Sequence, residues 1–66
     1  MDLPARPELR VGVHVEVTTR EHAGSYFGRR GVVSRIKANG DLVVGFVSGD
    51  GGVRELAFSA DEVRLL

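Results

Sequence analysis

Two runs of alternating residues joined by Asn39-Gly40 constrain the fold of this chain more than any other feature. The first run covers residues 31–37 and follows Gly28-Arg29-Arg30, and the second run covers residues 42–47. Alternation with a period of two is typical of a β-strand with one buried and one exposed face. Asn-Gly accepts the positive φ angles of a type I′ turn, which joins antiparallel strands. The pattern therefore predicts a β-hairpin.

Three further segments have the same alternation and extend the prediction to five strands. Residues 9–18 place valines at every second position, residues 53–58 alternate again, and residues 63–65 end the chain. The small polar run at 59–61 predicts a single 3₁₀ turn before the last strand. No window has the periodicity of a longer helix. We expect an all-β, five-stranded small barrel over residues 9–66, closed or nearly closed, after a flexible N-terminal arm at residues 1–8.

The strand at 31–37 carries apolar residues at both parities. Val33 lies at one parity, and Val32 and Ile36 lie at the other. Such a strand is either covered on both sides or bent by a bulge where it crosses a barrel corner. We expect Val33 and Ile36 in the core.

Size and charge exclude several classes of protein. The 66 residues contain no cysteine, so neither a disulfide nor a zinc–thiolate site can reinforce one small core. The N-terminus has no apolar signal region, and no apolar run approaches membrane-spanning length, so we expect a cytoplasmic protein.

Net charge is zero, but residues 1–40 carry seven of the nine basic groups. This asymmetry either attracts an anionic partner or is neutralised when the two parts interleave.

The chain resembles an SH3-like small β-barrel with a KOW-type pattern over residues 9–66. The residues that carry the resemblance are the run from Val11 to Val17, then Gly28, Gly31, Val33 and Ile36, then Val43, Val44 and Phe46, and the ending from Leu56 to Leu65. The ending is also similar, more weakly, to small photosynthetic subunits of SH3-like fold that help dock ferredoxin. The first resemblance implies RNA or DNA binding, and the second implies a scaffold without its own cofactor. The SH3-like fold alone does not choose between them.

The residues with catalytic or metal-binding potential form no recognisable motif. There is no cysteine, and neither histidine lies in a motif with a serine and a carboxylate. His14 has the polar parity of its strand, so we expect it in solvent. His22 could join Glu21 or Asp61 at a metal, but two histidines without ligand spacing are weak evidence. The run 48–52 is expected to be a hairpin turn. We expect no metal, no cofactor and no catalytic residue.

One group of residues has the composition of a binding site. Two aromatic residues precede a pair of arginines, and two more basic residues follow within the strand: Tyr26, Phe27, Arg29, Arg30, Arg35 and Lys37. Aromatic and guanidinium groups are enriched at protein–protein hot spots, and they also stack on bases and hold phosphates. Alternatively, Phe27 plugs one end of the barrel with Tyr26 packed over it, and the arginines are solvated surface.

Three functions remain open. The first is a non-catalytic binding module that docks onto a protein partner or larger assembly through the loop before the second strand. The second is a KOW-like RNA- or DNA-binding domain that uses the basic residues of the first 40 positions. The third is an oligomeric enzyme with a site on a symmetry axis, since small barrels can self-associate.

Overall fold

A computed structural model describes residues 9–22 and 24–66, and these residues form an all-β fold. The predicted arm at residues 1–8 lies outside the described residues. The elements in chain order are β1 (His14–Val17), η1 (Gly24–Tyr26), β2 (Arg30–Ile36), β3 (Leu42–Val47), β4 (Val53–Phe58), η2 (Ala60–Glu62) and β5 (Val63–Leu65). In the described part of the chain, no helix has the length and apolar character needed to span a bilayer.

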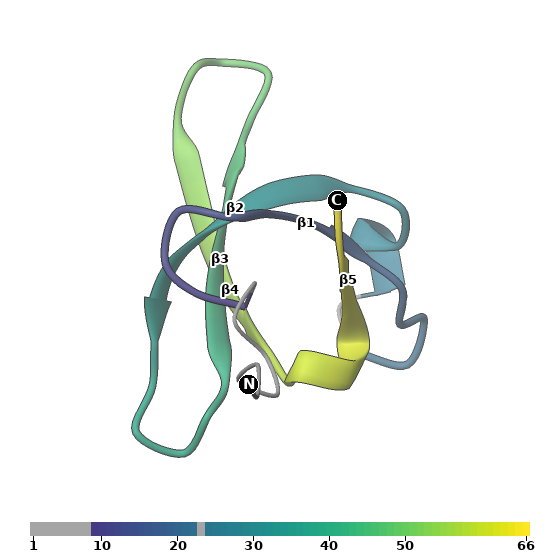
Figure 1. The fold of residues 1–66 in the computed structure, drawn as a ribbon. Helices are drawn as coiled ribbons and strands as arrows, with labels where there is room; N and C mark the ends of the chain where they lie inside the picture. Colours follow the sequence, from purple (N-terminus) through teal and green to yellow (C-terminus); the bar gives the residue numbers. More distant parts are fainter. Residues whose placement is uncertain (1–8, 23) are drawn as a thin grey trace.

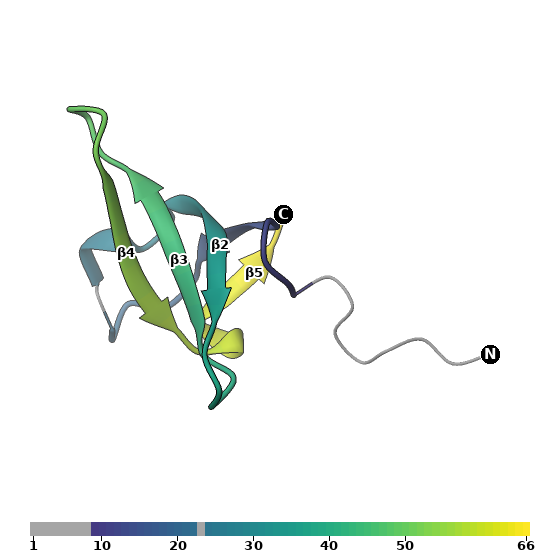
Figure 2. The same ribbon diagram turned by 90° about the vertical axis from the view of Figure 1, so that its left-hand side faces the viewer.

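All five strands belong to one antiparallel sheet with the order β4-β3-β2-β1-β5. The sheet curls around a central core, and η2 connects its two edge strands, β4 and β5 (Figure 1). The hairpin of β3 and β4 extends beyond the body of the sheet in both ribbon views (Figure 2). The prediction of five strands with a 3₁₀ turn before the last one is confirmed. The boundaries of β3, β4 and β5 match those read from the alternation.

The core lies on the concave side of the sheet and contains valines and two phenylalanines. Its buried members are Val15, Val17, Val33, Leu42, Val44, Phe46, Phe58 and Val63. The Phe46 and Phe58 rings meet edge to face with centroids 6.1 Å apart, a favoured aromatic geometry. These two rings fill the space that aliphatic side chains leave open.

The first strand is shorter than the alternation at residues 9–18 predicts. A turn at its start is closed by the Val13 amide, which donates to the Arg10 carbonyl at 3.3 Å, and Gly12 has a φ of +98°. Val11 at the tip of this turn is 58% exposed. Because a left-handed residue interrupts the extended backbone, regular pairing begins only at His14.

The loop at Asn39-Gly40 is longer than the predicted two-residue type I′ turn. The Gly40 amide donates to the Lys37 carbonyl at 2.9 Å, which makes Ala38 and Asn39 the central residues of the turn. Gly40 follows with a φ of +94°. This geometry is that of a three-residue hairpin loop with a left-handed glycine. The hairpin at residues 48–52, which the sequence also predicts, has the same loop geometry, with a left-handed glycine at Gly51 (φ +90°).

The apolar residues at both parities of β2 mark a bulge. The register between β2 and β3 shifts between Val33 and Arg35, so the strand bends as the pattern indicates. Val33 is fully buried. Ile36 is 40% exposed, and the expectation that it belongs to the core is wrong. The bulge places Ile36 opposite the buried Leu42, on the core face, so its exposure comes from its position at the end of β2 and not from its face.

Candidate binding site

The segment between β1 and β2 is anchored to the sheet by its own backbone. The Gly28 amide donates to the Val17 carbonyl, and the Val17 amide donates to the Arg29 carbonyl, both at 2.9 Å. The Phe27 amide donates to the Gly24 carbonyl at 3.1 Å and closes η1. These main-chain bonds fix the backbone of residues 26–29 just before β2.

Tyr26 and Phe27 are neighbours in sequence but have different environments. Tyr26 is half-buried, and its ring lies 4.8 Å from the Phe46 ring in the core. Phe27 is 45% exposed. The alternative in which Phe27 plugs the barrel is therefore wrong, because Phe46 and Phe58 already occupy the interior. Tyr26 anchors the loop, and Phe27 is available at the surface.

Each of these rings carries a guanidinium group. The Arg20 Cζ atom lies 4.1 Å from the Phe27 ring centroid, and the Arg29 Cζ atom lies 5.0 Å from that of Tyr26. Both distances are within the range of cation–π attraction. Arg20 has no signal in the sequence, because it precedes the aromatic pair by six positions and only the folded loop brings it onto Phe27.

Arg30 is engaged in a different contact. Its Nε atom lies 4.0 Å from Glu16 Oε1, and the same carboxylate oxygen accepts a 2.8 Å hydrogen bond from Arg64 Nη2. Glu16 lies within residues 1–40, which carry most of the basic groups, and Arg64 lies within residues 41–66. These contacts therefore do not offset the excess of basic groups in residues 1–40.

Arg35 and Lys37 lie apart from the other predicted site residues. They are at the opposite end of β2 from Arg30, roughly 20 Å away for a strand of this length. Arg30 is adjacent in sequence but contacts Glu16. The structure thus brings together Arg20, Tyr26, Phe27 and Arg29, which we call the loop cluster. It leaves Arg35 and Lys37 at the β2–β3 hairpin.

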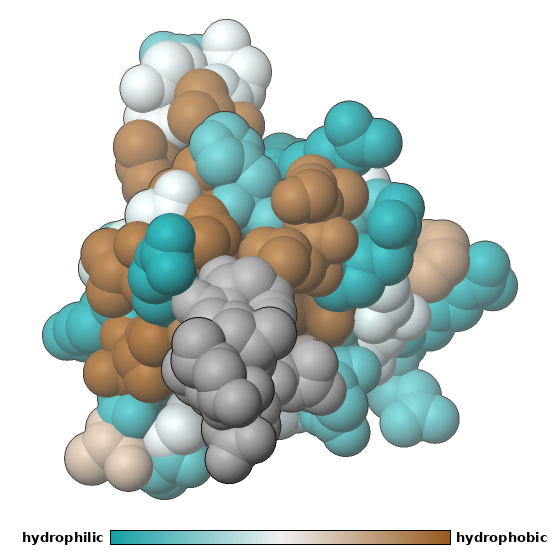
Figure 3. Space-filling view, in the orientation of Figure 1, coloured by the Kyte–Doolittle hydropathy of each residue, from teal (hydrophilic) through white to brown (hydrophobic). Residues whose placement is uncertain are grey.

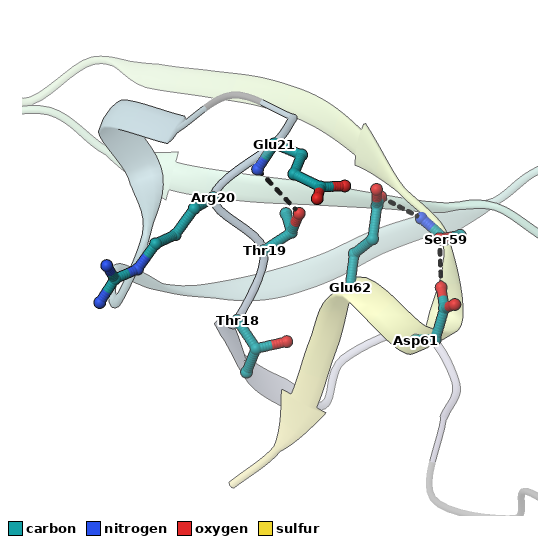
Figure 4. A pocket seen from close by; sticks show the side chains of 7 residues that line it. All are labelled: Thr18, Thr19, Arg20, Glu21, Ser59, Asp61 and Glu62. Atoms are coloured by element: carbon teal, nitrogen blue, oxygen red, sulfur yellow. Dashed lines mark hydrogen bonds between the residues drawn. The ribbon is translucent and has the colours of Figure 1, made fainter.

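An open hollow of about 450 Å³ lies beside the loop cluster. Its lining comes from the loop after β1 and from η2: Thr18, Thr19, Arg20, Glu21, Ser59, Asp61 and Glu62. The Arg20 side chain points away from the η2 residues that line it (Figure 4). Glu62 Oε1 accepts a hydrogen bond from the Ser59 amide at 2.9 Å, and the Ser59 hydroxyl donates to Asp61. Glu62 therefore caps η2, and Asp61 is held by the Ser59 side chain.

The two histidines have separate environments. His22 Nε2 donates to the Ala57 carbonyl at 2.9 Å, and its ring meets Phe58 edge to face at 5.3 Å. His14 is exposed on β1, opposite Val32. Within residues 9–22 and 24–66, no three histidine, aspartate or glutamate side chains are grouped to hold a metal ion.

Comparison with known proteins identifies no relative of this chain. No protein-family model matches it, and neither the curated proteins nor the solved structures contain a significant match.

Proposed function

We propose that this chain is a non-catalytic binding module of SH3-like type that acts in the cytoplasm and docks onto a protein partner through the loop cluster. The observation that supports the proposal is Phe27, an aromatic side chain 45% exposed that the core does not use. Exposed aromatic and arginine side chains on a rigid support are typical of binding hot spots.

The stacked guanidinium groups indicate the chemistry of the partner segment. The guanidinium groups of Arg20 and Arg29 lie over aromatic rings, at 4.1 Å and 5.0 Å from the ring centroids, so each is placed beside an apolar surface before binding. A planar guanidinium fits a carboxylate with two parallel hydrogen bonds. A partner segment with an apolar side chain next to an aspartate or glutamate would contact Phe27 and Arg20 together.

Nucleic acid is the second candidate, because an exposed ring beside arginines can also stack on an unpaired base. Arg30 contributes less to such a surface, since it already contacts Glu16. The two candidates differ in salt dependence, because phosphate contacts release counterions and affinity falls steeply with salt.

The test is affinity capture from the native cell with the intact chain as bait, with and without nuclease. Wild type is compared with Phe27→Ala and with a surface control, Val11→Ala, which truncates another exposed apolar side chain outside the loop cluster. We expect wild type and the control to retain the same protein after nuclease treatment, and Phe27→Ala to lose it. Capture that disappears with nuclease favours nucleic acid, and capture unchanged in Phe27→Ala rejects the site.

A further inference from the structure

The open edge of β4 offers a second interaction surface, independent of the loop cluster. The Ser48 amide donates to the Gly52 carbonyl at 2.8 Å, and hydrogen bonding in an antiparallel ladder alternates every second residue. Arg54 and Leu56 therefore exchange bonds with β3, while the main-chain groups of Val53 and Glu55 face the open edge. The next residue in this series, Ala57, has its carbonyl bonded to His22 Nε2, so only the first half of the edge is open.

The side chains beside this open half are apolar and exposed. Val47 and Val53 are paired across the hairpin and are 71% and 68% exposed. They lie on the outer face of the sheet, opposite the core. The space-filling view shows hydrophobic surface just below the tip of this hairpin (Figure 3). An open edge with exposed valines is a template for pairing with another strand.

We propose that β4 pairs with β4 of a second copy of this chain, in an antiparallel two-fold dimer centred on Val53. In this register the two Val53 residues lie opposite each other, with Val47 of each copy next in the row. Arg54 then faces Gly52 of the second copy, and Glu55 faces Gly51. The four valines form one continuous apolar row on the joined outer face.

The registers centred on the next two residues of β4 are unfavourable for reasons of charge and access. A register centred on Arg54 places the two arginines directly opposite each other. A register centred on Glu55 opposes two carboxylates and requires the main chain of Ala57, where His22 already lies. Like charges directly opposite across a strand pair are destabilising. The register centred on Val53 avoids opposed charges and does not use Ala57; the Gly51 amide opposite Glu55 already donates to the Ser48 carbonyl, which leaves the Gly51 carbonyl to accept from Glu55.

The other edge strand, β5, is not an equivalent partner. The Leu66 amide donates to the His14 carbonyl at 3.0 Å, so Val63 and Leu65 direct their main chains to the open edge of β5. Val63 belongs to the core face, whereas Val53 belongs to the outer face. Antiparallel pairing of β4 with β5 of another copy would therefore join an outer face to an inner face. Pairing of β4 with itself joins outer face to outer face.

Sedimentation of the intact chain tests the dimer. From about 10 μM to about 1 mM, a range suited to a small interface, we expect conversion from a monomer of 7.1 kDa to a dimer. Val53→Lys should weaken association at least about tenfold, because a charged edge residue opposes pairing. Val32→Lys, on the same outer face but on β2, is the control and should not change it. A monomer throughout, or a dimer unaffected by Val53→Lys, would overturn the proposal.

Cysteine trapping tests the register and does not depend on the stability of the lysine variants. The chain has no cysteine, so one introduced thiol can pair only with its own copy. Val53→Cys should oxidise rapidly to a disulfide-linked dimer, because opposed Cα atoms in a strand pair lie within bonding range. Glu55→Cys should react slowly, because glycine lies opposite it. Equal rates for the two variants would contradict the register.

Discussion

The loop cluster and the β3–β4 hairpin both expose apolar side chains, but they expose them in different ways. In the loop cluster, the Phe27 ring is covered by the Arg20 guanidinium, and Tyr26 fixes the loop to the core. In the hairpin, Val47 and Val53 have no such cover and lie beside an open strand edge. The loop cluster thus combines apolar area with charge, which suits an acidic partner segment. The hairpin combines apolar area with main-chain groups, which suits another strand.

We expect the largest effect from a substitution that disrupts the sheet supporting both regions. At Gly31 a Cβ atom would lie 2.6 Å from the Gly45 carbonyl oxygen and 2.6 Å from Val44 Cγ1, so Gly31→Ala would force β2 and β3 apart. We expect a loss of about 3 kcal/mol in the free energy of unfolding, measured by urea denaturation. Gly49→Ala is the control, since a Cβ atom there meets nothing within 4 Å. Similar stability of the two variants would show that the strands do not approach as closely as described.

The next effect is a difference in stability between removing the half-buried ring and removing the exposed ring of the loop cluster. Tyr26→Ala removes a ring that packs on Phe46, and we expect it to cost about 2 kcal/mol of stability. Phe27→Ala removes a largely exposed ring, and we expect it to cost less than about 0.5 kcal/mol. Thermal unfolding followed by circular dichroism measures both. Equal destabilisation by Phe27→Ala and Tyr26→Ala would contradict the different environments of the two rings.

A smaller effect concerns the ion pairs behind the loop cluster. Glu16→Gln removes the charge that contacts Arg30 and Arg64, and we expect a loss of about 0.5 kcal/mol that shrinks in about 1 M NaCl. Glu21→Gln is the matched control, because the described residues include no ion pair to Glu21. A loss for Glu16→Gln that is independent of salt would indicate a packing role.

The smallest effect concerns the pKa of Asp50, which lies in the turn between β3 and β4. Hydrogen bonds from the Ser48 hydroxyl and the Gly52 amide lower the pKa of Asp50 below its ordinary value. A carboxylate with a lowered folded-state pKa stabilises the fold above its unfolded pKa, and that contribution is lost as pH falls through the folded-state value. NMR titration of Asp50 should therefore give a pKa below the ordinary aspartate value, and Ser48→Ala should raise it. An Asp50 pKa unchanged by Ser48→Ala would contradict this cause.

Local patterns predicted the strands because side-chain parity is a local property. The runs at 42–47, 53–58 and 63–65 match β3, β4 and β5. The errors arose where one glycine redirects the chain. Gly12 shortens β1, and Gly40 lengthens the hairpin loop. Neither conformation can be read from alternation, because glycine accepts both signs of φ.

The residues of the loop cluster were predicted only in part, because their grouping depends on contacts between distant segments. The composition of residues 26–30 identified the aromatic pair and its arginines. It could not show that Tyr26 faces Phe46, that Phe27 faces solvent, or that Arg20 lies on Phe27. Arg35 and Lys37 were grouped by proximity in sequence, but an extended strand carries them away from the loop.

The most direct test of the binding proposal is titration calorimetry of the captured partner with wild type, Phe27→Ala and Arg20→Lys. We predict that Phe27→Ala weakens affinity at least about tenfold without a change in unfolding temperature. Arg20→Lys keeps the charge but loses the planar stack, and we predict an intermediate loss. Equal affinity for all three proteins would contradict the assignment of the partner site to Phe27 and Arg20.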